Sequence, residues 1–168
     1  MASCPDDSPR SIIVQMGLVF HLARAVAPAM EAHVAAAWPN EACGLLLGAV
    51  EGGCVRVLAA VPCANVASDP ARKFEIDPAA LIAAHRAARE GTGARVVGCF
   101  HSHPVGGAFP SARDVAAAAG DGAIWAIVAP ACGAVRHLST EQPSDWRIGW
   151  WQSSRNGFEH LSPREDAV

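Results

Sequence analysis

Two histidines and an aspartate form the pattern in this sequence that most strongly suggests chemistry. His101 and His103 stand one residue apart after the apolar run 96–100, and Asp114 follows after ten intervening residues. Residues i and i+2 of a strand share one face, so both imidazoles should point the same way and Ser102 the opposite way. Two imidazoles and one carboxylate give a three-ligand metal site with a fourth position open, which is typical of catalytic rather than structural zinc.

The segment after the histidines predicts a helix that would carry Asp114. Ser111 follows Pro110 and suits the N-cap position, and its spacing to Asp114 is that of a capping box. The histidines could instead be structural residues at a strand end, and the serine and aspartate a simple helix cap. A cap alone would not need the preceding histidine pair, so the metal site is our interpretation. Capping would then also hold Ser111 and Asp114 rigidly.

Other metal-dependent folds contain similar histidine pairs but do not fit this chain. A TIM barrel needs about 250 residues, and a cupin needs a glutamate where Pro104 to Gly107 stand. A non-heme iron triad usually contains a His-x-carboxylate pair. A zinc deaminase would show His-x-Glu with Pro-Cys-x-x-Cys, and neither pattern is present.

A hydrolytic metal site also needs a base that takes a proton from water and later gives one to the leaving nitrogen. Glu41 is the candidate, because it begins the apolar run 41–50, where a carboxylate is costly without a partner. A solvated loop glutamate is the alternative explanation from the local sequence. Glu75, Glu90 and Asp77 compete formally, although helix ends already account for Asp77 and Glu90.

The periodicity of the chain predicts the α/β (mixed α+β) class, with a single mixed, curved sheet flanked by helices. We expect helices over about 22–38 and 77–90 and a short one after Ser111. The expected strands are 17–22, 41–50, 54–61, 94–103, 123–129, 134–139, 145–152 and 158–161. We expect a flexible leader over 1–16, one domain over 17–161 and a polar, frayed tail over 162–168.

Composition excludes several classes of protein. With 168 residues, 51% hydrophobic and 17% charged, the chain can bury a real core. A net charge of −3 without a basic run argues against nucleic-acid binding. Residues 11–30 are apolar but interrupted by polar side chains, and no signal peptide is evident, so we expect no membrane span and a cytoplasmic location. The six cysteines form no C-x-x-C pair, which makes them buried thiols in our interpretation.

Some aromatic residues have two possible roles. His33 and His85 fit core or helix-surface positions better than metal ligation. The cluster formed by Trp146, Trp150 and Trp151 is either core packing or a partner surface.

Three segments together resemble one known family. They are Pro39-Asn-Glu41-Ala-Cys-Gly-Leu-Leu-Leu-Gly48, Gly98-Cys-Phe-His101-Ser-His103-Pro104 and Pro110-Ser111-Ala-Arg-Asp114. This pattern resembles the signature of JAMM (MPN-plus) zinc metalloproteases, and the compact chain is similar to the bacterial branch. Asn65 and the segment from Phe74 to Pro78 also fit the family's middle region.

The resemblance implies a JAMM/MPN-like (cytidine-deaminase-like) architecture and a role for each matching residue. His101, His103 and Asp114 would bind one zinc ion per chain, and Glu41 would act as general base and then acid. Ser111 would donate a hydrogen bond to the developing oxyanion. The implied activity is that of a peptidase or isopeptidase, a deubiquitinase-like hydrolase that uses zinc-activated water.

The family resemblance also suggests the substrate. The chain lacks the long insertions with which eukaryotic relatives grip ubiquitin. The expected partner is therefore a small ubiquitin-like sulfur-carrier protein with a C-terminal Gly-Gly, whose narrow tail fits beside a metal. The loop 105–109 could help to shape that groove. Two alternatives stay open: a zinc amidohydrolase acting on a small-molecule amide, and a non-catalytic module that binds a ubiquitin-like protein. The oligomeric state is unknown from sequence.

Overall fold

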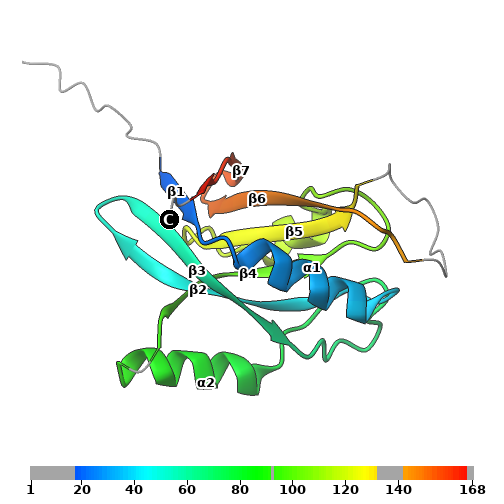
Figure 1. Ribbon diagram of the computed structural model, residues 1–168, viewed down its shortest axis with the longest axis horizontal. Helices are drawn as coiled ribbons and strands as arrows, with labels where there is room; N and C mark the ends of the chain where they lie inside the picture. The colour runs from blue at the N-terminus through cyan, green and yellow to red at the C-terminus, as the bar shows by residue number, and fades with distance from the viewer. Residues whose placement is uncertain (1–17, 92, 132–141, 166–168) are drawn as a thin grey trace, which may run out of the picture.

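One eight-stranded mixed sheet organises the protein. The computed structural model describes residues 18–91, 93–131 and 142–165. Along the sheet the strands follow the order β7-β6-β5-β4-β2-β3-β1-β8 (Figure 1). In chain order the elements are β1 (Val19–Leu22), α1 (Val26–Ala37), β2 (Cys43–Glu51), β3 (Cys54–Cys63), α2 (Pro78–Arg89), β4 (Arg95–Ser102), α3 (Ala112–Ala117), β5 (Ile124–Pro130), β6 (Trp146–Ser154), β7 (Gly157–Leu161) and β8 (Arg164–Glu165). The predicted fold class is confirmed.

The histidine pair lies at the end of β4, a central strand of the sheet. Strand β4 pairs antiparallel with β2 and parallel with β5, and every residue of β5 is buried. Gly98 is needed where β4 and β5 meet, because a Cβ there would lie 1.8 Å from the carbonyl oxygen of Ile124. The C-terminal end of β4 therefore places His101 at a fixed point in the middle of the sheet.

Helix α1 packs on one face of the sheet. Its residues Val26, Met30 and Val34 recur at four-residue intervals and are fully buried in the core. The predicted start near Leu22 is wrong, because Leu22 pairs with Val57 as the last residue of β1. The helix begins at Val26, which places Pro28 in its first turn, where proline is tolerated.

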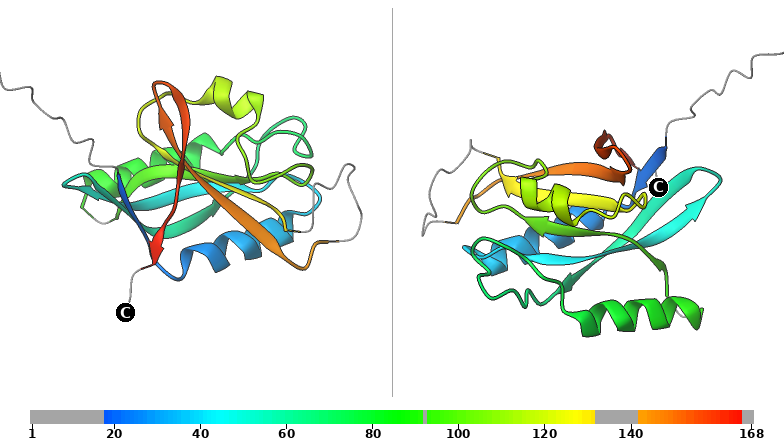
Figure 2. Two further views of the ribbon diagram at one scale, coloured as in Figure 1. Left: turned by 90° about the horizontal axis from the view of Figure 1, so that it is seen from above. Right: turned by 180° about the vertical axis from the view of Figure 1, so that it is seen from behind.

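Helices α2 and α3 lie on the opposite side of the sheet from α1 (Figure 2). Asp77 caps α2 as predicted, since its Oδ1 accepts a 2.9 Å hydrogen bond from the Ala79 N–H, and Pro78 is the first helical residue. None of the twelve residues of α2 is buried. Helix α3 is shorter and carries the aspartate of the site.

The chain ends differ from the expectation where the structure describes them. Arg164 and Glu165 pair with His21 and Leu22 of β1, so the polar tail is not frayed there and the sheet extends past residue 161. The leader 1–16 and the strand expected over 134–139 fall outside the described residues. Within the described part of the chain, no helix is long and apolar enough to cross a membrane.

Candidate metal centre and active site

The three residues of the predicted metal site meet at one point. His101 Nε2 and His103 Nε2 lie 3.0 Å apart, so the two rings do share one side of the strand end. Asp114 Oδ1 is 3.3 Å from His101 Nε2, and Asp114 Oδ2 is 3.4 Å from His103 Nε2. His101 and Asp114 are buried, and His103 is half-buried. The geometry thus brings together side chains from the end of β4 and from helix α3.

Ser111 and Asp114 form the reciprocal capping box at the start of α3. The Asp114 N–H donates to Ser111 Oγ at 3.2 Å, and the Ser111 N–H donates to Asp114 Oδ2 at 2.6 Å. The cap fixes the carboxylate in the orientation that faces the histidines. Ser111 Oγ accepts in this cap, and its hydroxyl also bonds to the Asp114 carboxylate, which helps to lower the pKa of Asp114.

The electrostatics of the cluster favour a carboxylate between the imidazoles. Burial tends to raise the pKa of Asp114, but hydrogen bonds from His101 and His103 outweigh it and hold that pKa far below its usual range. Burial lowers the pKa of His101 despite Asp114, which favours a neutral ring. Burial also acts to lower the pKa of His103, but hydrogen bonds to Asp114 and the Gly107 carbonyl raise it overall.

The donor set fits a divalent metal ion. Ligand atoms of His101, His103 and Asp114 all lie within 4.8 Å of one another. The Gly107 carbonyl lies 3.0 Å from His103 Nδ1 and can only accept, so that nitrogen carries a hydrogen and Nε2 is the nitrogen left to bind a metal ion. Two imidazole nitrogens with a carboxylate form a common zinc ligand set with an open position. A cation between them would relieve the crowding of electron-rich atoms.

Glu41 lies beside this cluster and not in a solvated loop. Its side chain is buried, with 9% of its surface exposed. Burial raises the pKa of Glu41 to about 7, since His103 opposes the shift only partly and Asp114 adds to it. The competing acidic residues have other surroundings: Asp77 caps α2, while Glu75 and Glu90 are exposed. Of the four candidates, Glu41 alone lines the cavity beside the cluster.

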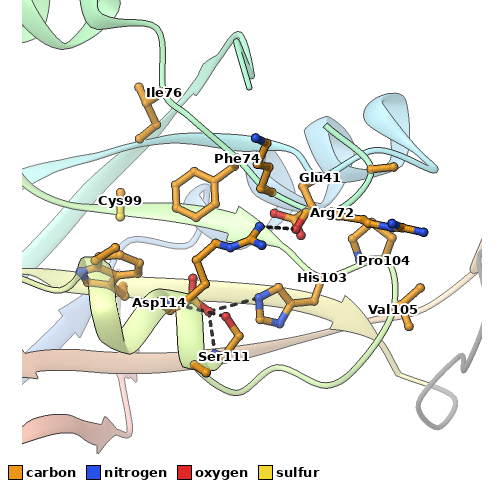
Figure 3. Close-up of a pocket in the computed structure, with 16 residues that line it drawn as sticks. Glu41, Arg72, Phe74, Ile76, Cys99, His103, Pro104, Val105, Ser111 and Asp114 are labelled. Carbon is orange, nitrogen blue, oxygen red and sulfur yellow. Dashed lines mark hydrogen bonds and ion pairs between the residues drawn. The ribbon is translucent and has the colours of Figure 1, made fainter. Parts of the chain in front are cut away.

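The cavity itself is a groove of about 860 Å³ that exposes part of the cluster. Figure 3 shows Glu41, His103, Ser111 and Asp114 directed into it from different elements. Phe74, Ile76 and Trp125 are among the side chains that line it. The groove therefore brings the Glu41 carboxyl group, the Ser111 hydroxyl and part of the His101, His103 and Asp114 cluster to one accessible surface.

Ser102 binds the backbone of Ala42, the residue between Glu41 and the start of β2. It points away from the histidines, as predicted, and its buried Oγ accepts a 2.8 Å hydrogen bond from the Ala42 N–H. The Ser102 N–H donates in turn to the Ala42 carbonyl at 2.9 Å. The peptide groups directly after Glu41 are thus fixed by β4.

The Ser102→Ala variant should lose stability, together with any hydrolytic activity in which Glu41 takes part. Without Oγ the buried Ala42 N–H loses its partner, which costs about 1–3 kcal/mol of unfolding free energy, measurable by urea denaturation. The matched control is Ser153→Ala, which removes an equally buried acceptor from the Gly120 N–H near the other end of β5. Both variants should lose stability, but only Ser102→Ala should lower kcat. If the two variants had equal kcat values, Ser102 would not act through Glu41.

Two cysteines and two tryptophans of the described residues can be placed relative to the cluster. Burial raises the pKa of Cys43 and of Cys99 to about 12, so both thiols stay protonated. Trp150 is core, with its ring 5.2 Å from that of Phe20. Trp151 is half-buried, and its Nε1 donates to the Ala108 carbonyl at 3.2 Å, which braces the loop after His103.

Most residues that line the groove were not predicted as part of the site, and two of them make specific contacts. Phe74 stacks on His101, with ring centroids 4.3 Å apart and an interplanar angle of 18°. Arg113 reaches from α3 across to the Arg72 carbonyl, to which its Nη1 donates at 2.8 Å. The family resemblance had singled out the segment from Phe74 to Pro78 but gave Phe74 no role. Nothing in the local sequence indicated the contact of Arg113.

Comparison with known proteins decides the family. Residues 23–149 match the family described as prokaryotic homologs of the JAB domain. The matched residues make up about three quarters of the chain. The chain belongs to this prokaryotic JAB family. The family assignment made from the histidine, serine and aspartate motif is confirmed.

Two relatives of this JAB protein have names that describe activities. A protein of Haloferax volcanii named desampylase is 37% identical over 92 residues, which are 55% of this chain and 64% of the relative. A protein of Thermus thermophilus named probable TtuB-protein conjugate cleaving protease is 35% identical over 99 residues, which are 59% of this chain and 63% of the relative. The matched segments thus span less than two thirds of either relative.

Two solved structures resemble the JAB protein over nearly its whole length. A protein from Desulfitobacterium hafniense superimposes with a TM-score of 0.71 at 27% identity, covering 89% of this chain and 94% of the other. A protein from Salinibacter ruber gives a TM-score of 0.61 at 30% identity, covering 87% and 91%. The arrangement of sheet and helices is therefore shared with experimentally determined structures.

Proposed function

We propose that this chain is a zinc-dependent peptidase or isopeptidase that hydrolyses the amide bond after a C-terminal Gly-Gly. The observation that carries the proposal is the buried carboxyl group of Glu41 at the groove beside His103 and Asp114. The relatives' names, a desampylase and a probable conjugate-cleaving protease, support hydrolysis of a bond between proteins.

We propose His101, His103 and Asp114 as the ligands of one zinc ion. Bound there, zinc would polarise the substrate carbonyl and lower the pKa of a water molecule in its open position toward about 7. The choice of zinc follows from the family resemblance and the mixed nitrogen and oxygen donors. The rest of the chemistry falls to the protein's own side chains.

Glu41 would move the proton that hydrolysis requires. As water attacks the carbonyl carbon, its oxygen forms the new C–O bond and Glu41 takes the proton. When the C–N bond breaks, Glu41 gives that proton to the leaving nitrogen, and the carboxylate product keeps the water oxygen. A pKa of about 7 suits both halves of this transfer. Ser111, which lines the groove, would donate its hydroxyl hydrogen to the carbonyl oxygen as negative charge develops there.

The groove suits an extended tail with small residues. Pro104 and Val105 line it on the side of the histidine loop, and Phe74 and Ile76 are apolar side chains that also line it. A Gly-Gly segment has no side chains to obstruct the approach of its backbone to the cluster. We therefore propose a small ubiquitin-like sulfur-carrier protein as the partner whose tail occupies the groove.

One observation favours a second candidate, a zinc amidohydrolase acting on a small molecule. The cavity volume of about 860 Å³ lies within the range of about 300–1,000 Å³ typical of small-molecule sites. A non-catalytic binding module is less consistent with the site, because Glu41 and Ser111 both line the groove beside the cluster.

A cleavage assay separates these candidates. The zinc-loaded protein is incubated with a sulfur-carrier protein joined through its Gly-Gly terminus to a lysine side chain or to a peptide. Parallel samples contain the same carrier without Gly-Gly and a series of small acyl-glycine amides, and mass spectrometry identifies the products. We expect cleavage after the second glycine only in the extended carrier. Faster cleavage of small amides would support the amidohydrolase, and binding without cleavage would support the module.

A further inference from the structure

The loop from Ala64 to Asp77, between β3 and α2, forms part of the groove. Its two ends pair with each other: the Val66 N–H donates to the Glu75 carbonyl at 2.9 Å, and the Asp77 N–H donates to the Ala64 carbonyl at 3.2 Å. Five of its residues line the cavity: Ala71, Arg72, Lys73, Phe74 and Ile76. The loop is therefore a defined structure beside the site.

Asn65 uses all the hydrogen-bonding capacity of its side chain within this region. Its Nδ2 donates to the Glu41 carbonyl at 2.8 Å and to the Lys73 carbonyl at 3.0 Å. Its Oδ1 accepts from the Ala67 N–H at 3.1 Å and from the Glu75 N–H at 3.0 Å. An amide offers two donors and two acceptor positions, and all four are satisfied by backbone groups. A single half-buried side chain thus ties four backbone positions together.

The first consequence concerns the backbone of Glu41. Its carbonyl accepts from Asn65, and its N–H donates to the Pro70 carbonyl at 2.7 Å. Both polar backbone groups of Glu41 are therefore bound by the same loop. Since Ser102 also accepts from the Ala42 N–H, the carboxyl group projects into the groove from a backbone that is fixed on both sides.

The second consequence concerns Phe74 and, through it, His101. Asn65 binds the residues immediately before and after Phe74, namely the Lys73 carbonyl and the Glu75 N–H. The Phe74 ring stacks on His101 at 4.3 Å. Metal-bound histidines usually have their second ring nitrogen oriented by a hydrogen bond. Among the described residues, the buried His101 Nδ1 has no such partner, so ring stacking supplies the orientation.

We infer that Asn65 is a positioning residue of this site. It holds Glu41 by a hydrogen bond to the Glu41 backbone carbonyl, and it holds His101 through the stacked ring of Phe74. The inference rests on the proposed function for the role of Glu41 and on the proposed zinc ligands for the role of His101. Asn65 contacts neither substrate nor metal in this arrangement and acts through the two residues that do.

Asn65→Asp tests the two donor bonds with almost no change of shape. The variant keeps an acceptor for the Ala67 and Glu75 N–H groups but turns a carboxylate oxygen toward the Glu41 and Lys73 carbonyls. We expect the zinc dissociation constant to rise about tenfold and kcat to fall about 10–100-fold, the range seen for outer-shell partners of metal sites. Hydrogen exchange at the Glu41 amide, followed by NMR, should accelerate. Unchanged zinc affinity and unchanged exchange would overturn the inference.

Asp77→Ala is the matched control. It removes another side-chain hydrogen bond to the backbone at the end of the same loop, from the Ala79 N–H at 2.9 Å, and Asp77 does not line the cavity. A merely structural role for the loop would make both variants behave alike. We expect Asp77→Ala to lose stability while its zinc affinity and kcat stay within about twofold of wild type. Equal losses in both variants would contradict a specific role for Asn65.

Phe74→Leu provides an independent test if Asn65→Asp does not fold. Leucine keeps apolar contact but removes the stacked ring, so zinc affinity should fall about tenfold while the Asn65 bonds stay intact. Unchanged zinc affinity would refute the claim that the Phe74 ring orients His101. Zinc affinity and amide exchange do not depend on turnover. A wild-type protein that fails to cleave the carrier would therefore count against the proposed function, whereas these two measurements would still decide the role of Asn65.

Discussion

Glu41→Gln is expected to retain zinc and to lose turnover by about 10²–10⁴-fold, the usual contribution of a positioned acid or base. The amide has nearly the shape of the carboxyl group but cannot accept a proton from water at neutral pH. The loss should therefore appear in kcat. Single-turnover cleavage of the Gly-Gly-extended carrier measures it, and metal analysis of the same sample shows that the ligands are intact.

The control for this result is Glu90→Gln, which makes the same chemical change at an exposed carboxylate at the end of α2. Its kcat should match that of wild type. Normal cleavage by Glu41→Gln would remove Glu41 from its proposed role. Loss of zinc by Glu41→Gln would instead place Glu41 among the groups on which the metal depends.

The same substitution has an expected effect on the stability of the metal-free protein. Burial raises the folded-state pKa of Glu41 from 4.5 to about 7, so the unfolded chain loses this proton at lower pH than the folded one. The wild type should therefore lose stability relative to Glu41→Gln as pH rises through that window, and the difference should be constant above it. Urea denaturation in the presence of a chelator at pH 4, 6 and 8 measures the difference.

The convergence of His101, His103 and Asp114 was predictable because each part depends on local geometry. His101 and His103 share a face since side chains alternate along a strand, whatever the sheet around them. Ser111 and Asp114 are joined by a capping box, whose pattern is visible within four residues. Only the contact between the end of β4 and the start of α3 depends on the tertiary fold, and the resemblance to the family motif predicted that contact.

The support around the cluster was not predictable from local patterns. The bonds from Asn65 to Glu41 and the stacking of Phe74 on His101 join residues 24 and 27 positions apart in sequence. An asparagine in a polar loop is ordinarily a turn residue, and nothing in its neighbours indicates four backbone partners. The pairing of β8 with β1 was missed for a similar reason, because two polar residues have no strand periodicity of their own.

His101→Ala is expected to abolish zinc binding and, with it, the stabilisation that zinc gives to the folded protein. A ligand bound only to the folded state at about 100 times its dissociation constant adds about 2.7 kcal/mol to the unfolding free energy. The truncated side chain also leaves a cavity beside Phe74 and Trp125, whose rings contact His101, so the variant should be less stable even without metal.

Denaturation with and without a chelator separates these two losses. Removing zinc should shift the unfolding midpoint of wild type but leave that of His101→Ala unchanged, and the difference that persists in chelator measures the cavity. The matched control is His33→Ala, which removes another partly buried histidine ring, 6.0 Å from Phe100 and not part of the cluster. That variant should keep both its zinc and its sensitivity to chelator. Equal zinc content in His101→Ala and wild type would mean that this imidazole is not a ligand, and that the convergence of His101, His103 and Asp114 needs another explanation.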